Sequence, residues 1–183
     1  PISILVDALK DLGCDIEYIE KKGFPPLKIN GKNILSNSVT LPANVSSQYV
    51  SSLMMLGVSL KNGLKIILSS NITSLPYLLM TKKMIERIGG IVKIQEREIF
   101  IEPFKEKTIS EQFVESDWSS ASYFFSLAAL SSSVNLTLSK FSKHSLQGDS
   151  KLVDIYKMFG IETIFKDDQI ILKKNKISLP KNI

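Results

Sequence analysis

The sequence repeats itself, and this restricts the possible folds more than any other feature. Three stretches share one pattern, an amphipathic helical segment that ends at a glycine and is followed by residues of alternating polarity. They are residues 5–18, 80–94 and 152–164. Two serine-rich strings, 46–53 and 119–127, resemble each other and precede the second and third stretch. The period is roughly 70 to 75 residues, so copies of one supersecondary unit make up the chain.

Hydrophobic periodicity predicts the same order of elements in both complete copies of the repeat. Each copy is expected to run strand, helix, strand, helix, strand, strand. The expected ranges are 38–41, 46–60, 64–68, 75–88, 91–95 and 98–101 in one copy, and 112–115, 119–130, 134–138, 146–159, 162–165 and 169–172 in the next. The pattern predicts an α/β (α+β) fold of repeated βαβαββ units, in which crossover helices cover the sheets.

The chain does not begin at the start of a copy. Residues 2–29 are predicted to hold one helix and two strands, the closing half of a unit, so we expect a piece of a longer repeat protein. The apolar pattern breaks at 103–111, where lysine and glutamate alternate, and this break is the expected boundary between two partial globular domains.

Composition excludes several classes of function. With 44% hydrophobic and 22% charged residues over 183 positions, the chain is long enough to bury a core and should be a folded globular protein. No apolar run approaches the roughly 18 residues that a membrane span needs. Cys14 is the only cysteine, so no internal disulfide can form and a cytoplasmic location is expected. Because there is also only one histidine, we expect no zinc or thiol site, no metal and no cofactor.

The net charge of +5 comes mostly from lysine and leaves three interpretations open. A basic surface could bind nucleic acid, but the sequence has no interleaved aromatic residues and no arginine cluster, since Arg87 and Arg97 are its only arginines. A solvated lysine-rich surface explains the charge more simply. A positive potential could also favour a small anionic substrate in a cleft.

Two predicted helix starts carry the strongest candidates for chemistry. Ser46, Ser47 and Gln48 stand where one helix begins, so two hydroxyls, a carboxamide and unpaired backbone N–H groups can surround an anion. Ser74 and Tyr77 flank the start of the next helix. From the residues alone, simple capping is the stronger interpretation of the serines, because serine caps a helix well without any ligand.

The later serine-rich string favours structure over function. At 119–127 the serines compete with Asp117 for the capping position of a helix. The Gln-Gly-Asp string at 147–149 is predicted to serve as a turn and cap. We therefore assign neither string a ligand.

Several strings together resemble a known family. They lie at 1–13, 25–27, 46–55, 74–81, 117–123 and 147–149. In that order and spacing they resemble 5-enolpyruvylshikimate-3-phosphate synthases, and the resemblance covers essentially the whole chain. Its most specific parts are the Ser-Ser-Gln and Ser-x-Pro-Tyr strings. The family is built from six βαβαββ units in two domains of three, which implies that residues 1–113 are the latter part of the first domain and 114–183 the opening unit of the second.

The resemblance implies a function as well. The family is a transferase of the shikimate pathway, in chorismate and aromatic amino acid biosynthesis. It moves the enolpyruvyl group of phosphoenolpyruvate to the 5-hydroxyl of shikimate 3-phosphate, through a tetrahedral intermediate and without a metal. By resemblance, Ser46, Ser47 and Ser74 hold the 3-phosphate, where hydroxyls and helix dipoles suit a dianion. Gln48 would bond the substrate and approach phosphoenolpyruvate, and Tyr77 would lie against the shikimate ring.

The family's other functional groups have no counterpart in this sequence. Its lysine and arginine clamps and its catalytic acid–base groups would lie before Pro1 or after Ile183, so we assign no catalytic residue and expect this central fragment alone to be inactive. The implied partners are shikimate 3-phosphate and phosphoenolpyruvate, with no nucleic acid and no membrane. The full enzyme is expected to be a monomer, whereas the fragment could self-associate through uncovered apolar faces.

Two alternatives remain open. UDP-N-acetylglucosamine enolpyruvyl transferases share the repeat fold and the phosphoenolpyruvate chemistry, but their sequence strings are not found here. A non-catalytic RNA-binding module that uses lysine-rich sheet faces would instead show a steep salt dependence of oligonucleotide binding.

Overall fold

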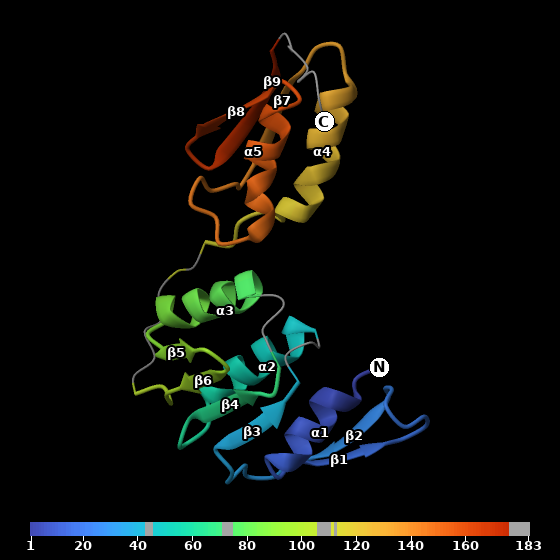
Figure 1. Cartoon of the computed structure of the whole chain (residues 1–183), viewed down its shortest axis with the longest axis vertical. Coiled ribbons are helices and arrows are strands. Elements are labelled where there is room, and N and C mark those ends of the chain that lie inside the picture. Colours follow the sequence, from blue (N-terminus) through green and yellow to red (C-terminus); the bar gives the residue numbers. More distant parts are fainter. Residues whose placement is uncertain (43–45, 71–74, 106–110, 112, 176–183) are drawn as a thin grey trace. The chain divides into compact units, whose positions relative to one another are not determined.

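A computed structural model describes residues 1–42, 46–70, 75–105, 111 and 113–175. The chain divides into two compact units, Pro1–Ser110 and Glu111–Ile183, which we call the N-terminal and the C-terminal unit (Figure 1). Each combines helices with sheet and has its own hydrophobic core, which is the mixed α/β class expected from the sequence. Within the described ranges, no helix has the length and apolarity needed to cross a bilayer. The assignment of residues 1–113 and 114–183 to two domains of a longer protein stays a prediction.

The N-terminal unit contains one complete βαβαββ repeat. Its elements are β3 (Ser38–Leu41), α2 (Ser47–Gly57), β4 (Leu64–Leu68), α3 (Leu75–Arg87), β5 (Val92–Gln95) and β6 (Glu98–Ile101). The strands form one sheet in the order β3-β4-β6-β5, where β3 and β4 are parallel and the other pairs antiparallel. Alternate residues of β4 are buried, as a period of two residues per strand requires when one face is covered.

The half unit predicted at 2–29 shares the core of this repeat. It consists of α1 (Ser3–Asp11), β1 (Asp15–Tyr18) and β2 (Leu27–Asn30), and the two strands pair antiparallel. Ala8 and Leu12 are buried in the same hydrophobic cluster as residues of β3, β4 and α2. The half unit is therefore part of the N-terminal unit and not a separate body.

Gly13 ends α1 in the manner that the glycine-terminated pattern predicts. Its φ is 100°, and its N–H donates to the Lys10 carbonyl at 2.8 Å. The N–H of Cys14 donates to the Leu9 carbonyl at 2.9 Å. These two bonds form a Schellman motif, which requires the left-handed conformation that glycine adopts readily.

The C-terminal unit has a related but smaller set of elements. They are α4 (Trp118–Leu130), β7 (Asn135–Ser139), the 3-10 helix η1 (Gly148–Lys151), α5 (Leu152–Lys157), β8 (Ile161–Lys166) and β9 (Gln169–Lys174). Its sheet has the order β7-β9-β8, which is the order of β4-β6-β5 in the N-terminal unit. The core is centred on Trp118, whose ring meets the Phe141 ring edge-on at a centroid distance of 4.9 Å.

The two sheets repeat with a period of 71 residues. Glu96 and Asp167, which are 71 positions apart, are each the first residue of a two-residue hairpin turn and have positive φ angles of 47° and 52°. The strands that flank these turns pair in the same register. The repeat in the sequence is thus a repeat of structure, and its period identifies equivalent positions in the two units.

The prediction of a strand at 112–115 is wrong for residues 113–115. Residues 113–115 belong to no strand, and residue 112 lies outside the described residues. One backbone hydrogen bond, from the Ser116 N–H to the Lys140 carbonyl at 2.6 Å, joins this segment to the end of β7. Phe113 and Val114 are 58% and 79% exposed, so burial does not favour pairing of this segment along β7. The described C-terminal unit therefore lacks the first strand of a βαβαββ repeat.

The helix predicted at 146–159 starts later than expected, because the side chain of Gln147 is held outside it. The Gln147 amide donates to the Ser116 carbonyl at 2.9 Å, and its side-chain oxygen accepts the Trp118 N–H at 2.9 Å. The backbone of Gln147 is extended, with φ −73° and ψ 129°. Helical structure begins only with η1 and continues into the short α5.

Candidate anion-binding site at the starts of α2 and α3

The starts of α2 and α3 lie at one edge of the sheet. β3 and β4 are parallel neighbours, and their last residues, Leu41 and Leu68, are paired. α2 follows β3 and α3 follows β4, so both helices begin beyond the carboxyl ends of adjacent strands. Ligands of α/β sheets commonly bind in the crevice outside such strand ends. The fold thereby brings residues 46–48 and 75–77 to the same edge.

Ser46 is the N-cap of α2. Its backbone is non-helical, with φ −51° and ψ 125°, and its Oγ accepts the N–H of Gln48 at 3.3 Å. The hydroxyl also lies 3.5 Å from the side-chain oxygen of Gln48, and both residues are exposed. The capping interpretation is therefore confirmed, and it leaves the hydroxyl and the carboxamide accessible to a ligand.

Ser47 is the first residue of α2 and is half-buried. No side-chain hydrogen bond joins it to another residue of the described part of the chain. The first turn of α2 contains no acidic residue, and the helix carries no charge along its length. Its first N–H groups therefore retain the positive potential of a helix start, which favours an anion.

Tyr77 lies in the first turn of α3, where Leu75 and Pro76 begin the helix. Its side chain is 51% exposed. Ser74, the fifth residue implied by the family resemblance, lies outside the described residues. The structure thus brings Ser46, Ser47, Gln48 and Tyr77 to one sheet edge, while their ligand contacts stay predictions.

A hydrogen bond joins α2 to α3 one turn below these residues. The hydroxyls of Ser51 and Thr81 lie 2.9 Å apart, and the Thr81 hydroxyl donates to the Tyr77 carbonyl at 3.1 Å. Thr81 is only 9% exposed and is the one buried polar side chain among the described residues. Nothing in the sequence marks Thr81, because its role depends on which faces of the two helices meet.

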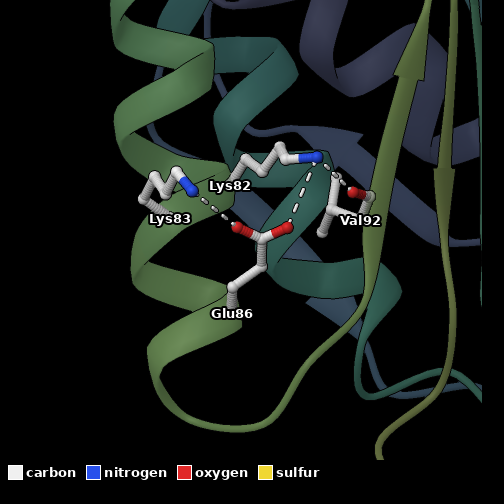
Figure 2. Close-up of polar contacts among 4 residues, drawn as sticks. All are labelled: Lys82, Lys83, Glu86 and Val92. Carbon is white, nitrogen blue, oxygen red and sulfur yellow. Dashed lines mark hydrogen bonds and ion pairs between the residues drawn. The ribbon is translucent and has the colours of Figure 1, made fainter.

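Two lysines of α3 are engaged away from the helix start. Lys82 Nζ donates to the Val92 carbonyl at 2.7 Å and lies 3.3 Å from the Glu86 carboxylate, and Lys83 Nζ lies 3.6 Å from the same carboxylate (Figure 2). These contacts tie α3 to the first residue of β5. These two lysines are therefore not aimed at the candidate site, whose own donors are helix N–H groups and hydroxyls.

The start of α4 differs from that of α2, because an acidic side chain caps it. Asp117 is the N-cap, and its carboxylate accepts the N–H groups of Ser119 at 3.0 Å and Ser120 at 3.2 Å. The Ser120 hydroxyl also donates to Asp117 at 2.6 Å, and the Ser119 hydroxyl donates to the Asp149 carboxylate. The adjoining pocket of about 400 Å³ has Asp117 in its wall. A carboxylate thus already occupies the position that an anionic ligand would take.

The serine-rich strings at 46–53 and 119–127 do not match in the register that the sequence suggested. The N-caps Ser46 and Asp117 are 71 residues apart, which is the period of the sheets. Asp117 is therefore the counterpart of Ser46, and Ser119 is the counterpart of Gln48. The match by composition sets Ser119 and Ser120 against Ser46 and Ser47. In α4, however, Ser119 and Ser120 lie inside the first turn, and Asp117 is the cap.

The bonds at Asp117 lead us to expect an acid-dependent stability of the C-terminal unit. The Ser120 hydroxyl, followed by the Ser119 backbone N–H, lowers the pKa of Asp117 from its ordinary value of 3.8. A carboxylate with a lowered folded-state pKa stabilises the fold above the ordinary pKa, and this contribution is lost as pH falls through the folded-state pKa. We expect Asp117→Asn to be less stable than wild type near neutral pH, and the difference in stability to narrow as the pH falls below 3.8.

Tryptophan fluorescence can measure this effect, since Trp118 is the only tryptophan and lies in the C-terminal unit. Urea midpoints are compared from about pH 7 to about pH 2 for wild type and Asp117→Asn. Asp168→Asn is the control, because the exposed Asp168 carboxylate has no hydrogen bond to another described residue. A difference at Asp117 that does not narrow on acidification would contradict the expectation.

These features together define a class of protein. Parallel strands lead into two helix starts at one sheet edge, which carry hydroxyl, amide and phenol side chains, and no acidic residue caps α2. This arrangement is typical of α/β proteins that bind phosphate esters and other anions at helix N-termini. In the part of the chain that the structure describes, no group of three or more His, Cys, Asp or Glu side chains is placed to hold a metal ion.

Comparison with known proteins then gives the family. The family model of EPSP synthase (3-phosphoshikimate 1-carboxyvinyltransferase) matches residues 1–182. A 3-phosphoshikimate 1-carboxyvinyltransferase of Bacteroides fragilis strain YCH46 is 42% identical over 176 residues, which are 96% of this chain and 43% of the relative. That of Colwellia psychrerythraea strain 34H is 35% identical over 172 residues, 93% of this chain and 40% of the relative. The chain belongs to the EPSP synthase family.

A solved structure shares the fold. The EPSP synthase from Acinetobacter baumannii aligns with a TM-score of 0.64 at 20% identity, covering 98% of this chain and 42% of that chain. The predicted α/β fold class is thereby confirmed, and the family model and the relatives confirm the predicted family. The chain spans less than half the length of these relatives.

Proposed function

We propose that this chain forms part of a 3-phosphoshikimate 1-carboxyvinyltransferase and supplies part of its site for shikimate 3-phosphate. Ser46, Ser47 and Ser74 hold the 3-phosphate, Gln48 bonds the substrate, and Tyr77 lies against the shikimate ring. The observation that carries the proposal is the meeting of the α2 and α3 starts at one sheet edge. Membership of the EPSP synthase family supports it.

The proposed reaction is an addition followed by an elimination. The 5-hydroxyl oxygen of shikimate 3-phosphate bonds to the central carbon of phosphoenolpyruvate, the methylene carbon gains a proton, and the hydroxyl loses one. The resulting tetrahedral intermediate expels inorganic phosphate and loses a proton from its methyl carbon. The double bond is thereby restored in the enolpyruvyl ether, and atoms and charge balance.

The residues of this chain bind and orient the substrate in the proposed reaction. Serine hydroxyls and helix N–H groups give a phosphate dianion short, charge-assisted hydrogen bonds. Residues 46–48 and 75–77 include no carboxylate and no imidazole. General acid–base catalysis needs such groups within hydrogen-bond reach of the proton that moves. We therefore propose that proton transfer depends on groups outside these 183 residues and that the chain alone has no turnover.

We also propose that the protein carrying this chain works in the cytoplasm as a monomer and binds neither nucleic acid nor membranes. Its single cysteine requires no oxidising compartment. Several lysines lie beside acidic partners, as in the Lys65–Glu98 pair at 2.7 Å and the Lys93–Glu102 pair at 3.4 Å. Interspersed charges of this kind are typical of a solvated surface, not of a basic patch for nucleic acid.

A phosphate-release assay of the full-length protein tests the proposed function. Phosphoenolpyruvate is supplied with shikimate 3-phosphate, with shikimate, or with UDP-N-acetylglucosamine as acceptor. We expect rapid release only with shikimate 3-phosphate, and none from the 183-residue chain alone. Release with the nucleotide sugar would contradict the proposal, and so would equal rates with shikimate, because the 3-phosphate would then not be recognised.

A further inference from the structure

In the C-terminal unit, side-chain hydroxyls join α4 to the segment η1–α5 at two places, in the first and in the third turn of α4. In the first turn, the Ser119 hydroxyl donates to the carboxylate of Asp149 in η1. In the third turn, the hydroxyls of Ser126 and Tyr156 lie 2.7 Å apart and join α4 to α5. The first of these bonds engages a side chain at the helix start, so that side chain is not available to a ligand.

In the N-terminal unit, α2 and α3 are joined at the second turn of α2, between the two places that are bonded in α4. The 71-residue period makes Gln48 and Leu78 the counterparts of Ser119 and Asp149, and an apolar Leu78 cannot bond Gln48. The bond instead joins Ser51 and Thr81, one turn further along each helix. The first turns of α2 and α3 are therefore spaced by a bond that uses none of their own side chains.

We propose that the Ser51–Thr81 hydrogen bond positions the substrate site by fixing the separation of the α2 and α3 starts. This inference rests on the proposed function. Ser51 lies one turn after Ser47 on α2, and Thr81 lies one turn after Tyr77 on α3. The Thr81 hydroxyl also lies 3.1 Å from the Tyr77 carbonyl, and its one hydrogen is shared between Ser51 and that carbonyl, so the contact reaches the backbone of a candidate site residue. Ser51 and Thr81 are positioning residues that do not touch the substrate.

The position of the Ser51–Thr81 bond along the helices and its burial both suit a positioning role. One turn of helix is about 5.4 Å, so the bond holds the helices close to the ligand groups without using those groups itself. Because Thr81 is 9% exposed, water competes poorly for its hydroxyl. Displacements of about 1 Å weaken ligand contacts and catalysis strongly, so a fixed separation matters to a ligand that spans both helix starts.

Steady-state kinetics of the full-length protein test the inference. Thr81→Val keeps the shape of the side chain and removes the hydroxyl. We expect it to raise the KM for shikimate 3-phosphate by about fivefold to tenfold and to change kcat by less than about twofold, as lost ground-state binding does. Thr81→Ser restores the hydroxyl and is expected to restore the KM to within about twofold of wild type.

The interhelical hydroxyl bond of the C-terminal unit provides the matched control. Tyr156→Phe removes the Ser126–Tyr156 hydrogen bond, which also joins two helices but has no candidate ligand group attached. We expect it to lower thermal stability about as much as Thr81→Val does while leaving the KM unchanged. A KM that is unchanged in Thr81→Val, not restored in Thr81→Ser, or equally raised in Tyr156→Phe overturns the inference.

The same assay separates this inference from the proposed function. If the wild-type protein releases phosphate with shikimate 3-phosphate and Thr81→Val is kinetically identical to it, only the positioning role fails. If the wild-type protein shows no such release, the proposed function fails, and the positioning role fails with it because there is no substrate site to position.

Discussion

Replacing Ser47 with alanine is expected to weaken binding of shikimate 3-phosphate to the full-length protein by about tenfold to a hundredfold. A hydrogen bond to a charged group contributes roughly 1.5–3 kcal/mol, and each 1.4 kcal/mol is about tenfold in affinity. The Ser47 side chain has no hydrogen bond to another described residue, so its loss breaks no contact that the structure describes within the protein. The free energy of unfolding is therefore expected to change by less than about 0.5 kcal/mol.

Calorimetric titration with two ligands distinguishes loss of the phosphate contact from a general disturbance. Ser47→Ala should weaken binding of shikimate 3-phosphate but not of shikimate, which lacks the phosphate. Ser59→Ala is the control, since the Ser59 hydroxyl donates to the Leu56 carbonyl at 2.7 Å at the other end of α2. An unchanged dissociation constant in Ser47→Ala would exclude a role for its hydroxyl, and an equal loss in Ser59→Ala would indicate damage to the helix.

Replacing Gly63 with alanine is expected to destabilise the N-terminal unit by about 3 kcal/mol or more. Gly63 has a φ of 67°, and a Cβ there would lie 2.2 Å from the Ile101 carbonyl oxygen. Ile101 is paired with Leu64, so its carbonyl cannot move away without disturbing the pairing of β6 with β4. The substitution therefore combines an unfavourable backbone conformation with a clash against backbone.

Gly13→Ala separates these two causes. Gly13 has a φ of 100°, but nothing lies within 4 Å of the Cβ position. Its replacement is expected to lower the free energy of unfolding by about 1–2 kcal/mol, which is the cost of the left-handed backbone conformation alone. Far-UV circular dichroism during urea unfolding follows both units, whereas Trp118 fluorescence follows the C-terminal unit and should show an unchanged transition. A Gly63→Ala effect no larger than that of Gly13→Ala would exclude the proposed clash.

Much of the N-terminal unit could be predicted from the sequence. β4 has the predicted bounds, Leu64–Leu68, because its short apolar run lies between Gly63 and the polar pair Ser69-Ser70. α3 ends within one residue of its predicted end, where Gly89 supplies a positive φ of 88°. Both signals are local and strong, so neighbouring elements were not needed to interpret them.

The C-terminal unit shows where local patterns fail. The order of the repeat predicts a strand at 112–115, but a sequence pattern cannot show whether a neighbouring strand pairs with it, and residues 113–115 form no strand. The helix at 146–159 was predicted too long, because the contacts of Gln147 come from residues 116 and 118. The serine-rich strings were aligned by composition, which does not reveal which residue caps α4.

The sequence by itself determined the repeat, the family, the glycine-terminated ends of α1 and α3 and the residue types at each helix start, because these follow from periodic burial and from local backbone preferences. Only the tertiary structure decided which helix start still has N–H groups and hydroxyls free to bind an anion. Ser119 is bonded to Asp149 and Ser51 to Thr81, each across 30 residues of sequence. Contacts over that separation depend on how helices pack on a sheet, and packing determines whether a serine at a helix start is engaged within the protein or accessible to a ligand.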